Sequence, residues 1–216
     1  MTDPDREAST DPDPDDPDRI VTGGVEPDRA EAMGRRLMRT AGRLGMDEPA
    51  RALVLDAFKV AMKPRLARIQ EDHDPDYLHP ARTALILMDD TGEADTVTLA
   101  AALFTETRDP TFAARPDAME RVSPDAARLA AQIPVPDHTD RLLETLLALP
   151  DPGIRVAAAE RLDHARHLHL RPEGEWPAGH AVTRDAYVPV TRRVDATLAA
   201  RLEWWCDMFE RRFLEA

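Results

Sequence analysis

Three side chains able to bind a divalent metal ion lie within one short stretch of this 216-residue sequence. His79 is followed by Pro80, a pair that is typical of a helix start, and Glu106 and Asp109 follow the next apolar run. A helix N-terminus favours the neutral form of an imidazole, and a neutral imidazole beside carboxylates suits a hard or borderline divalent ion. The stretch therefore predicts metal chemistry, if its two ends meet.

A second group of ligand-type residues lies further along the chain. Glu160, Asp163, His164 and His167 are spaced so that one face of a helix carries all four. Such a face is either a source of metal ligands or a polar surface turned to solvent. The spacing alone leaves both interpretations open.

Helices must position both groups. The apolar run after Pro80 predicts a helix from His79 to about Asp90, and Asp95 can cap a second helix that reaches Phe104. Gly92 lies in the polar turn between them, so we expect a helical hairpin in which His79 meets Thr105, Glu106 and Asp109. A further helix starting at Asp151 has to cross this hairpin if Glu160 is to approach His79. No strand pattern competes, so the fold class is all-α.

Several segments carry a family resemblance. The pair His79-Pro80, the run AALFTETRDP ending at Pro110, VAAAERLDHARHL (156–168) and AYVPVTRRVDATLAARLE (186–203) occur in the order of corresponding motifs in the HD-domain superfamily. They resemble most closely the guanosine polyphosphate (ppGpp) hydrolase domain of RelA/SpoT-like proteins. The resemblance covers roughly residues 51–209 and implies an HD-domain-like helical bundle.

The same resemblance implies where a metal ion would bind. Placed residue by residue, the family's metal ligands fall on His79, Thr105, Glu106 and Glu160, so a threonine replaces one imidazole. The family's catalytic acidic pair falls on Asp109 and a proline. His164 could replace the missing imidazole through its place beside Glu160, and Asp109 would orient water. The ligand set that follows is His79, Glu106, Glu160 and His164.

Three functions follow from these matches and departures. The leading interpretation is a catalytically impaired HD domain, a pseudoenzyme that binds a nucleotide such as a guanosine polyphosphate or regulates a protein partner. The alternative is a divergent metal-dependent phosphohydrolase that removes pyrophosphate from the 3′ position of such nucleotides with Mn²⁺ or a similar ion. The third is a structural helical module. The impaired form would hold no metal.

Composition limits the partners. A formal net charge of −13 and a pI near 4.9 argue against nucleic acid and anionic membranes. Residues 1–25 are rich in Asp and Pro, which predicts a disordered acidic tail before one helical domain at 26–216. An acidic start without an apolar segment, no run of transmembrane length and a single cysteine predict a cytoplasmic protein.

Other residues have more ordinary expected roles. The basic residues Lys63, Arg65 and Arg68 could reach a phosphate but fit a solvated face better. His180 is expected in a surface loop, and Cys206 as a packed thiol. The apolar stripe of the last helix fits a core or a homodimer surface. Its neighbouring tryptophans, Trp204 and Trp205, would mark a partner site if they are exposed.

Overall fold

The structure is a computed structural model, and it describes residues 27–67, 75–136 and 141–215. All regular elements in these ranges are helical, which confirms the all-α class. The acidic tail predicted at 1–25 lies outside the described residues. Within the described ranges, none of the helices combines the length and apolar character needed to cross a bilayer.

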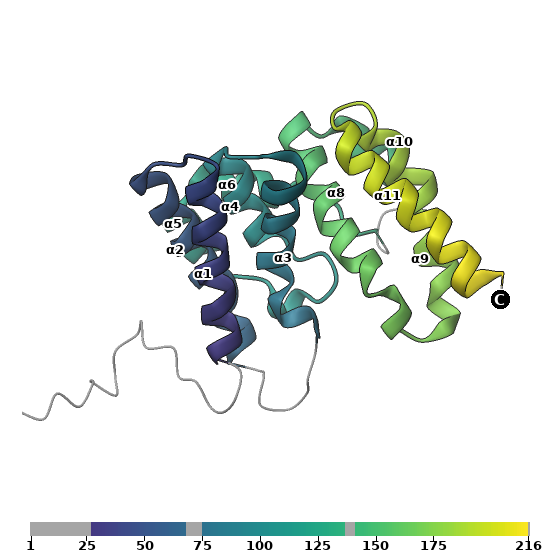
Figure 1. Cartoon of the computed structure of the whole chain (residues 1–216). Helices are drawn as coiled ribbons and strands as arrows, with labels where there is room; N and C mark the ends of the chain where they lie inside the picture. The colour runs from purple at the N-terminus through teal and green to yellow at the C-terminus, as the bar shows by residue number, and fades with distance from the viewer. Residues whose placement is uncertain (1–26, 68–74, 137–140, 216) are drawn as a thin grey trace, which may run out of the picture.

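The helices follow one another with short connections (Figure 1). Their bounds are α1 (Pro27–Arg43), α2 (Glu48–Leu66), α3 (His79–Ile86), α4 (Thr96–Phe104), α5 (Pro116–Val122), α6 (Pro124–Ala130), α7 (Leu142–Ala148), α8 (Asp151–Arg166), α9 (Trp176–Val182), α10 (Val188–Thr191) and α11 (Ala196–Phe209). Short 3₁₀ turns cover Pro75–Leu78, Pro110–Phe112, Leu168–Leu170 and Glu173–Glu175, and π-helical turns cover Leu87–Thr91, Thr183–Tyr187 and Glu210–Leu214.

Side-chain caps start several of these helices. The carboxylate of Asp47 accepts from the backbone amide of Ala50 at the start of α2, and Asp95 accepts from Thr98 at the start of α4. Ser123 does the same for α6. Each cap satisfies an amide that has no partner inside the helix. The predicted cap at Asp95 is therefore confirmed.

The predicted hairpin is present. Helix α3 runs into a π-helical turn, and the chain then reverses at Gly92, whose φ of 74° lies in the left-handed region. Leu78 occupies the N-cap position of α3. The 3₁₀ turn before α3 leads directly into the helix, which makes His79 its first residue.

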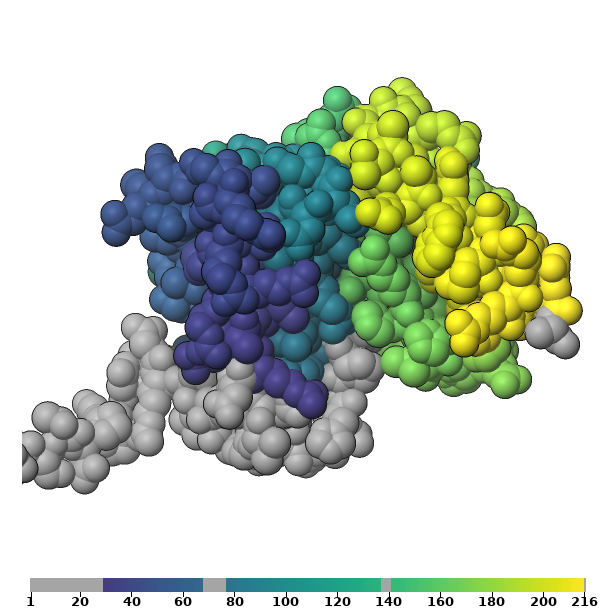
Figure 2. Space-filling view, in the orientation of Figure 1, coloured from purple at the N-terminus to yellow at the C-terminus, as the bar shows by residue number. Residues whose placement is uncertain are grey.

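Helices α4 and α8 form the centre of the molecule. Helix α4 is buried from Thr98 to Phe104 and packs against α2, α3, α6 and α8. Helix α8 packs against α3 on one side and α11 on the other, so it joins the N-terminal and C-terminal helices (Figure 1). Figure 2 shows part of α8 at the surface between these two groups. The buried apolar side chains form one cluster that extends from α1 to α11.

Two further helices lie in proline-containing segments, and one of them includes His180, which the sequence placed in a surface loop. Residues 116–122 form α5, and residues 176–182 form α9, which buries His180 to 3% exposure. In both helices a proline lies at the first or second position, where its missing amide proton is not needed. The surface location predicted for His180 is wrong, because its Nε2 lies 3.1 Å from the backbone oxygen of Cys206 in the core.

Neighbouring residues of the last helix differ in how far they are buried. Cys206 is buried, and burial together with the nearby Asp207 raises the pKa of its thiol to about 11. The prediction of a packed, unreactive thiol is confirmed. Trp205 is 2% exposed, whereas Trp204 is 64% exposed, so α11 presents one tryptophan to its surroundings and buries the other.

The reversal at Gly92 gives a stability prediction. A Cβ at Gly92 meets nothing within 4 Å, so substitution by alanine acts through the left-handed backbone alone. We expect Gly92→Ala to lower the free energy of unfolding by about 1 kcal/mol, measured by urea denaturation. Gly174→Ala is the matched control, since that site is equally open but its φ is not left-handed. Equal effects of the two substitutions would contradict the role assigned to Gly92.

Candidate metal centre

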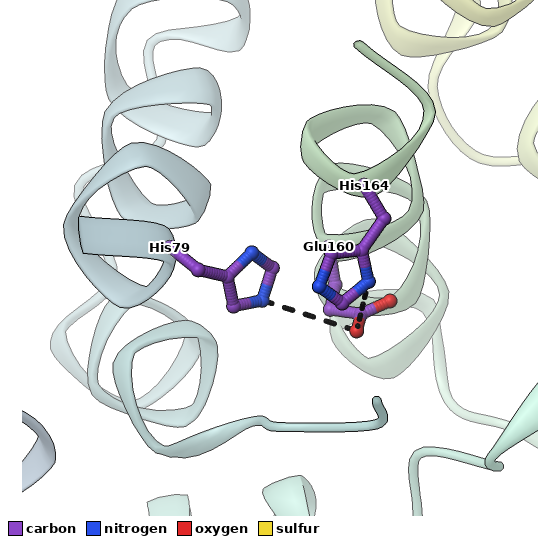
Figure 3. Close-up of side chains that lie close together, drawn as sticks. All are labelled: His79, Glu160 and His164. Atoms are coloured by element: carbon purple, nitrogen blue, oxygen red, sulfur yellow. Dashed lines mark ion pairs between the residues drawn. The ribbon is translucent and has the colours of Figure 1, made fainter. Parts of the chain in front are cut away.

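His79, Glu160 and His164 converge between α3 and α8 (Figure 3). All three side chains are buried, and each offers one ligand atom that lies within 4.8 Å of the other two. The Oε1 atom of Glu160 is 3.1 Å from Nδ1 of His164 and 3.9 Å from Nε2 of His79. These are residues that could hold a metal ion.

Local structure explains how the three meet. Glu160 and His164 are one helical turn apart on α8 and therefore lie on one face. His79 is the first residue of α3, which packs against α8, so the crossing required by the sequence is present. The rings of His79 and His164 stack with their centroids 4.2 Å apart and their planes 11° from parallel. The polar face of α8 is thus turned into the protein at this point.

Glu160 supplies the carboxylate among the three donors, and its side chain is completely buried. Its Oε1 atom accepts a hydrogen bond from the hydroxyl of Thr107, and its Oε2 atom has no hydrogen-bond partner among the described residues. Burial alone raises the pKa of Glu160, but the charge and hydrogen bond of His164, the charge of His79 and the Thr107 hydroxyl lower it to about 2. The group is therefore a carboxylate with one oxygen left to bind.

The separations of Glu160 from the two imidazoles suit a divalent ion. Ligands about 2.1 Å from a tetrahedral ion lie roughly 3.4 Å from one another, and the two contacts of Glu160 Oε1 with the imidazoles, 3.1 and 3.9 Å, bracket that spacing. Two imidazoles and one carboxylate are suited to ions such as Zn²⁺ or Mn²⁺. An ion would also balance the charge of a carboxylate that is removed from water.

Glu106, the fourth predicted ligand, is not part of this group. Its carboxylate pairs with Arg65, and the two side chains are 3% and 1% exposed. Its Oε1 atom also accepts from the backbone amides of Arg108 and Asp109, at 2.8 and 3.1 Å. Arg65 donates further to the backbone oxygen of Phe112. The structure thus joins three of the four predicted ligands and places the fourth in a buried ion pair.

That ion pair corrects a second expectation. Arg65 was expected on a solvated basic face, but it is buried because Glu106 and the carbonyl of Phe112 satisfy its guanidinium. Lys63 lies in the same turn of α2. Arg68 lies outside the described residues. Arg65, at least, therefore contributes to the packing of α2.

Asp109 and Thr105 have local partners. The carboxylate of Asp109 accepts hydrogen bonds from the backbone amide and the hydroxyl of Thr111. Asp109 thereby caps the 3₁₀ turn that follows. The hydroxyl of Thr105 donates to the backbone oxygen of Ala101. The side chains that hold the ring of His79 come from α8. The sequence predicted that they would come from the end of α4, and this prediction is wrong.

Sequence reasoning missed the roles of three residues around the centre. Asp163 lies 2.8 Å from Nδ1 of His79 and also accepts from Arg82, while Thr107 donates to Glu160. Asp163 belongs to the predicted polar face of α8, so its burial could have been inferred together with that of Glu160. Arg82 lies three residues after His79 on α3, a spacing that could have suggested a shared partner. Thr107 has no comparable signal.

A cavity of about 340 Å³ adjoins the centre. Its wall includes His164, which is one of the three donors, Thr107, which donates to Glu160, and two arginines. Arg161 is held by the hydroxyl of Thr183 and the carbonyl of Gly179, and Arg108 lies 3.9 Å from Glu175. The remaining lining residues are Pro136, Ala165, Leu168, Gly174, Glu175, Ala178 and Gly179.

Comparisons of this chain with protein-family models, curated proteins and solved structures found no match. The resemblance to HD domains therefore stays a prediction that rests on the residues quoted above.

The ion pair of Glu106 gives a second stability prediction. Replacing Glu106 with glutamine removes the carboxylate that pairs with the buried guanidinium of Arg65, and we expect a loss of about 3–5 kcal/mol in unfolding free energy. Glu120→Gln, on an exposed part of α5, is the control and should change stability by less than about 0.5 kcal/mol. If Glu106→Gln were as mild as the control, the buried pair would not contribute to folding.

Proposed function

We propose that this chain binds one divalent metal ion through His79, Glu160 and His164 and acts as a divergent metal-dependent phosphohydrolase. The observation that carries the proposal is the convergence of two imidazoles on a buried carboxylate that retains one oxygen without a hydrogen bond. The resemblance to RelA/SpoT-like hydrolases implies guanosine polyphosphates or related nucleotides as substrates.

Each donor has a different role in holding a metal ion. Glu160 supplies the negative charge, and the hydroxyl of Thr107 fixes one of its oxygens by donating a hydrogen bond. His79 and His164 approach from two different helices, so the packing of α3 against α8 sets their separation. When bound, a divalent ion lowers the pKa of a coordinated water and neutralises charge on phosphoryl oxygens.

The adjoining cavity supports a phosphorylated ligand. Guanidinium groups bind phosphate through two parallel N–H donors, and Arg108 and Arg161 line the cavity beside the metal donors. Hydrogen bonds to Thr183 and Gly179 hold Arg161 in place before any ligand arrives, which reduces the conformational entropy lost on binding. A phosphoryl group placed there would lie next to the metal centre.

We also propose a second function, a binding module without efficient turnover. The reason is that two acidic residues that could have helped catalysis have structural partners. Glu106 is paired with Arg65, and Asp109 caps a turn through Thr111, so neither is placed here to take a proton from water. These contacts favour a protein that binds metal and a phosphorylated ligand without efficient turnover. Such a protein would act as a regulatory module, alone or with a protein partner, and it differs from the impaired form expected from the sequence because it holds a metal ion.

Metal binding tests the centre directly. We expect purified protein to bind one equivalent of Mn²⁺ or Zn²⁺ in isothermal titration calorimetry, and His79→Ala or His164→Gln to abolish that binding because each removes one of three donors. His169→Ala, a substitution at an exposed histidine, should leave the affinity unchanged. Absence of a saturable site in the unmodified protein would refute the proposed centre.

Release of pyrophosphate from ppGpp in the presence of Mn²⁺ separates the two functions. Turnover that is lost in His79→Ala and kept in His169→Ala supports the phosphohydrolase. Saturable binding of ppGpp without turnover supports the impaired module. If the protein neither binds nor hydrolyses ppGpp although it binds metal, the substrate class implied by the resemblance is wrong.

A further inference from the structure

Asp163 is a buried carboxylate that the metal donors do not include, although it lies three residues from Glu160 on the same helix. Both of its oxygens have partners. Oδ1 accepts from Nε of Arg82 at 2.7 Å, and Oδ2 lies 2.9 Å from Nη2 of Arg82 and 2.8 Å from Nδ1 of His79. Its oxygens are therefore directed at α3 and not at the three donors.

This contact determines which nitrogen of His79 carries hydrogen. An ionised carboxylate can only accept hydrogen bonds, so Nδ1 of His79 must donate to Oδ2 of Asp163. In the neutral ring the lone pair is then on Nε2. That nitrogen faces Oε1 of Glu160 at 3.9 Å, and its other close contact is the hydroxyl of Thr83 at 3.5 Å. The Thr83 hydroxyl itself donates to the backbone oxygen of His79.

Arg82 fixes the position of the Asp163 carboxylate. It is three residues after His79 on α3, so both side chains leave the same face of that helix and reach one carboxylate. The fork of a guanidinium matches the two oxygens of a carboxylate and defines its plane as well as its distance. Burial alone raises the pKa of Asp163, but His79 and Arg82 together lower it well below its usual range.

We infer that Asp163 and Arg82 are positioning residues for the metal centre. Asp163 holds the Nδ1–H of His79, and the bidentate contact with Arg82 holds Asp163, so that Nε2 is the nitrogen of His79 left to bind a metal ion beside Glu160 and His164. The inference rests on the proposed metal function for its purpose, but the hydrogen-bond arrangement exists without any ion. Partners of this kind commonly change metal affinity by roughly 10–100-fold.

The first test uses the unmodified, metal-free protein. Two-bond ¹H–¹⁵N correlation spectra of ¹⁵N-histidine-labelled protein distinguish the two neutral tautomers of each ring, and the His79 signals are assigned by their absence in His79→Gln. We expect His79 as the Nδ1–H tautomer. Finding the Nε2–H tautomer, or a mixture, in the unmodified protein would overturn the inference.

The second test measures Zn²⁺ affinity by competition with a chromophoric chelator. We expect Asp163→Asn and Arg82→Lys each to weaken binding by roughly 10–100-fold, because the first removes the charged acceptor and the second removes the fork. Arg155→Lys is the matched control for the arginine, since Arg155 on α8 is 29% exposed, compared with 21% for Arg82, and also pairs with carboxylates. It should change the affinity less than twofold.

These measurements separate failure of the inference from failure of the proposed function. A protein with His79 in the Nδ1–H form that binds no Zn²⁺ would retain the positioning contact and refute the metal centre. A protein that binds Zn²⁺ with equal affinity before and after Asp163→Asn, with the tautomer of His79 unchanged, would retain the metal centre and refute the role of Asp163.

Discussion

The burial of two carboxylates between α3 and α8 is the constraint on which the arrangement depends. Glu160 and Asp163 both lose their hydration there, which costs several kcal/mol for each ionised group unless nearby donors replace the water. Asp163 is compensated by Arg82 and by His79. Glu160 has the hydroxyl of Thr107 and two imidazoles but keeps one oxygen without a hydrogen bond. The less compensated of the two carboxylates is therefore the one that faces the candidate metal position.

The segment after α4 connects this centre to a second buried ion pair. The carboxylate of Glu106 binds Arg65 of α2 and two backbone amides of its own turn, and this fixes the path of the chain. Thr107 follows directly and donates to Glu160. A structural ion pair and a candidate functional centre thus depend on two consecutive residues, Glu106 and Thr107. Damage to the pair at Glu106 would be transmitted to the centre through the position of Thr107.

Local rules in the sequence were enough to predict the hairpin, its caps and the common face of Glu160 and His164. Helical periodicity and capping depend on residues only three or four apart. The partner of Glu106 could not be predicted in this way, because Arg65 is 41 positions away and the choice depends on how α2 packs against α4. The burial of His180 was missed for the same reason, since its partner Cys206 belongs to α11.

Asp163 shows a different limit. Its place on the polar face of α8 was evident, but the direction of its oxygens depends on Arg82 and on the angle at which α3 crosses α8. Sequence spacing gives the face of a helix and not the distance between two side chains on neighbouring helices. The three-dimensional structure was required to distinguish Glu160 and His164, which are candidate donors for an ion, from Asp163, which contacts the third donor, His79.

The position of His164 near the end of α8 has a kinetic consequence. The helix ends at Arg166, so His164 lies in its last turn, whereas Glu160 lies one turn further inside. Terminal turns open far more often than helix interiors, because fewer backbone hydrogen bonds must break. Opening of this turn withdraws one imidazole and leaves Glu160 and His79 in place. The lifetime of an ion in the centre would then be set by the fraying rate of one helix end, while its affinity is set by the closed state.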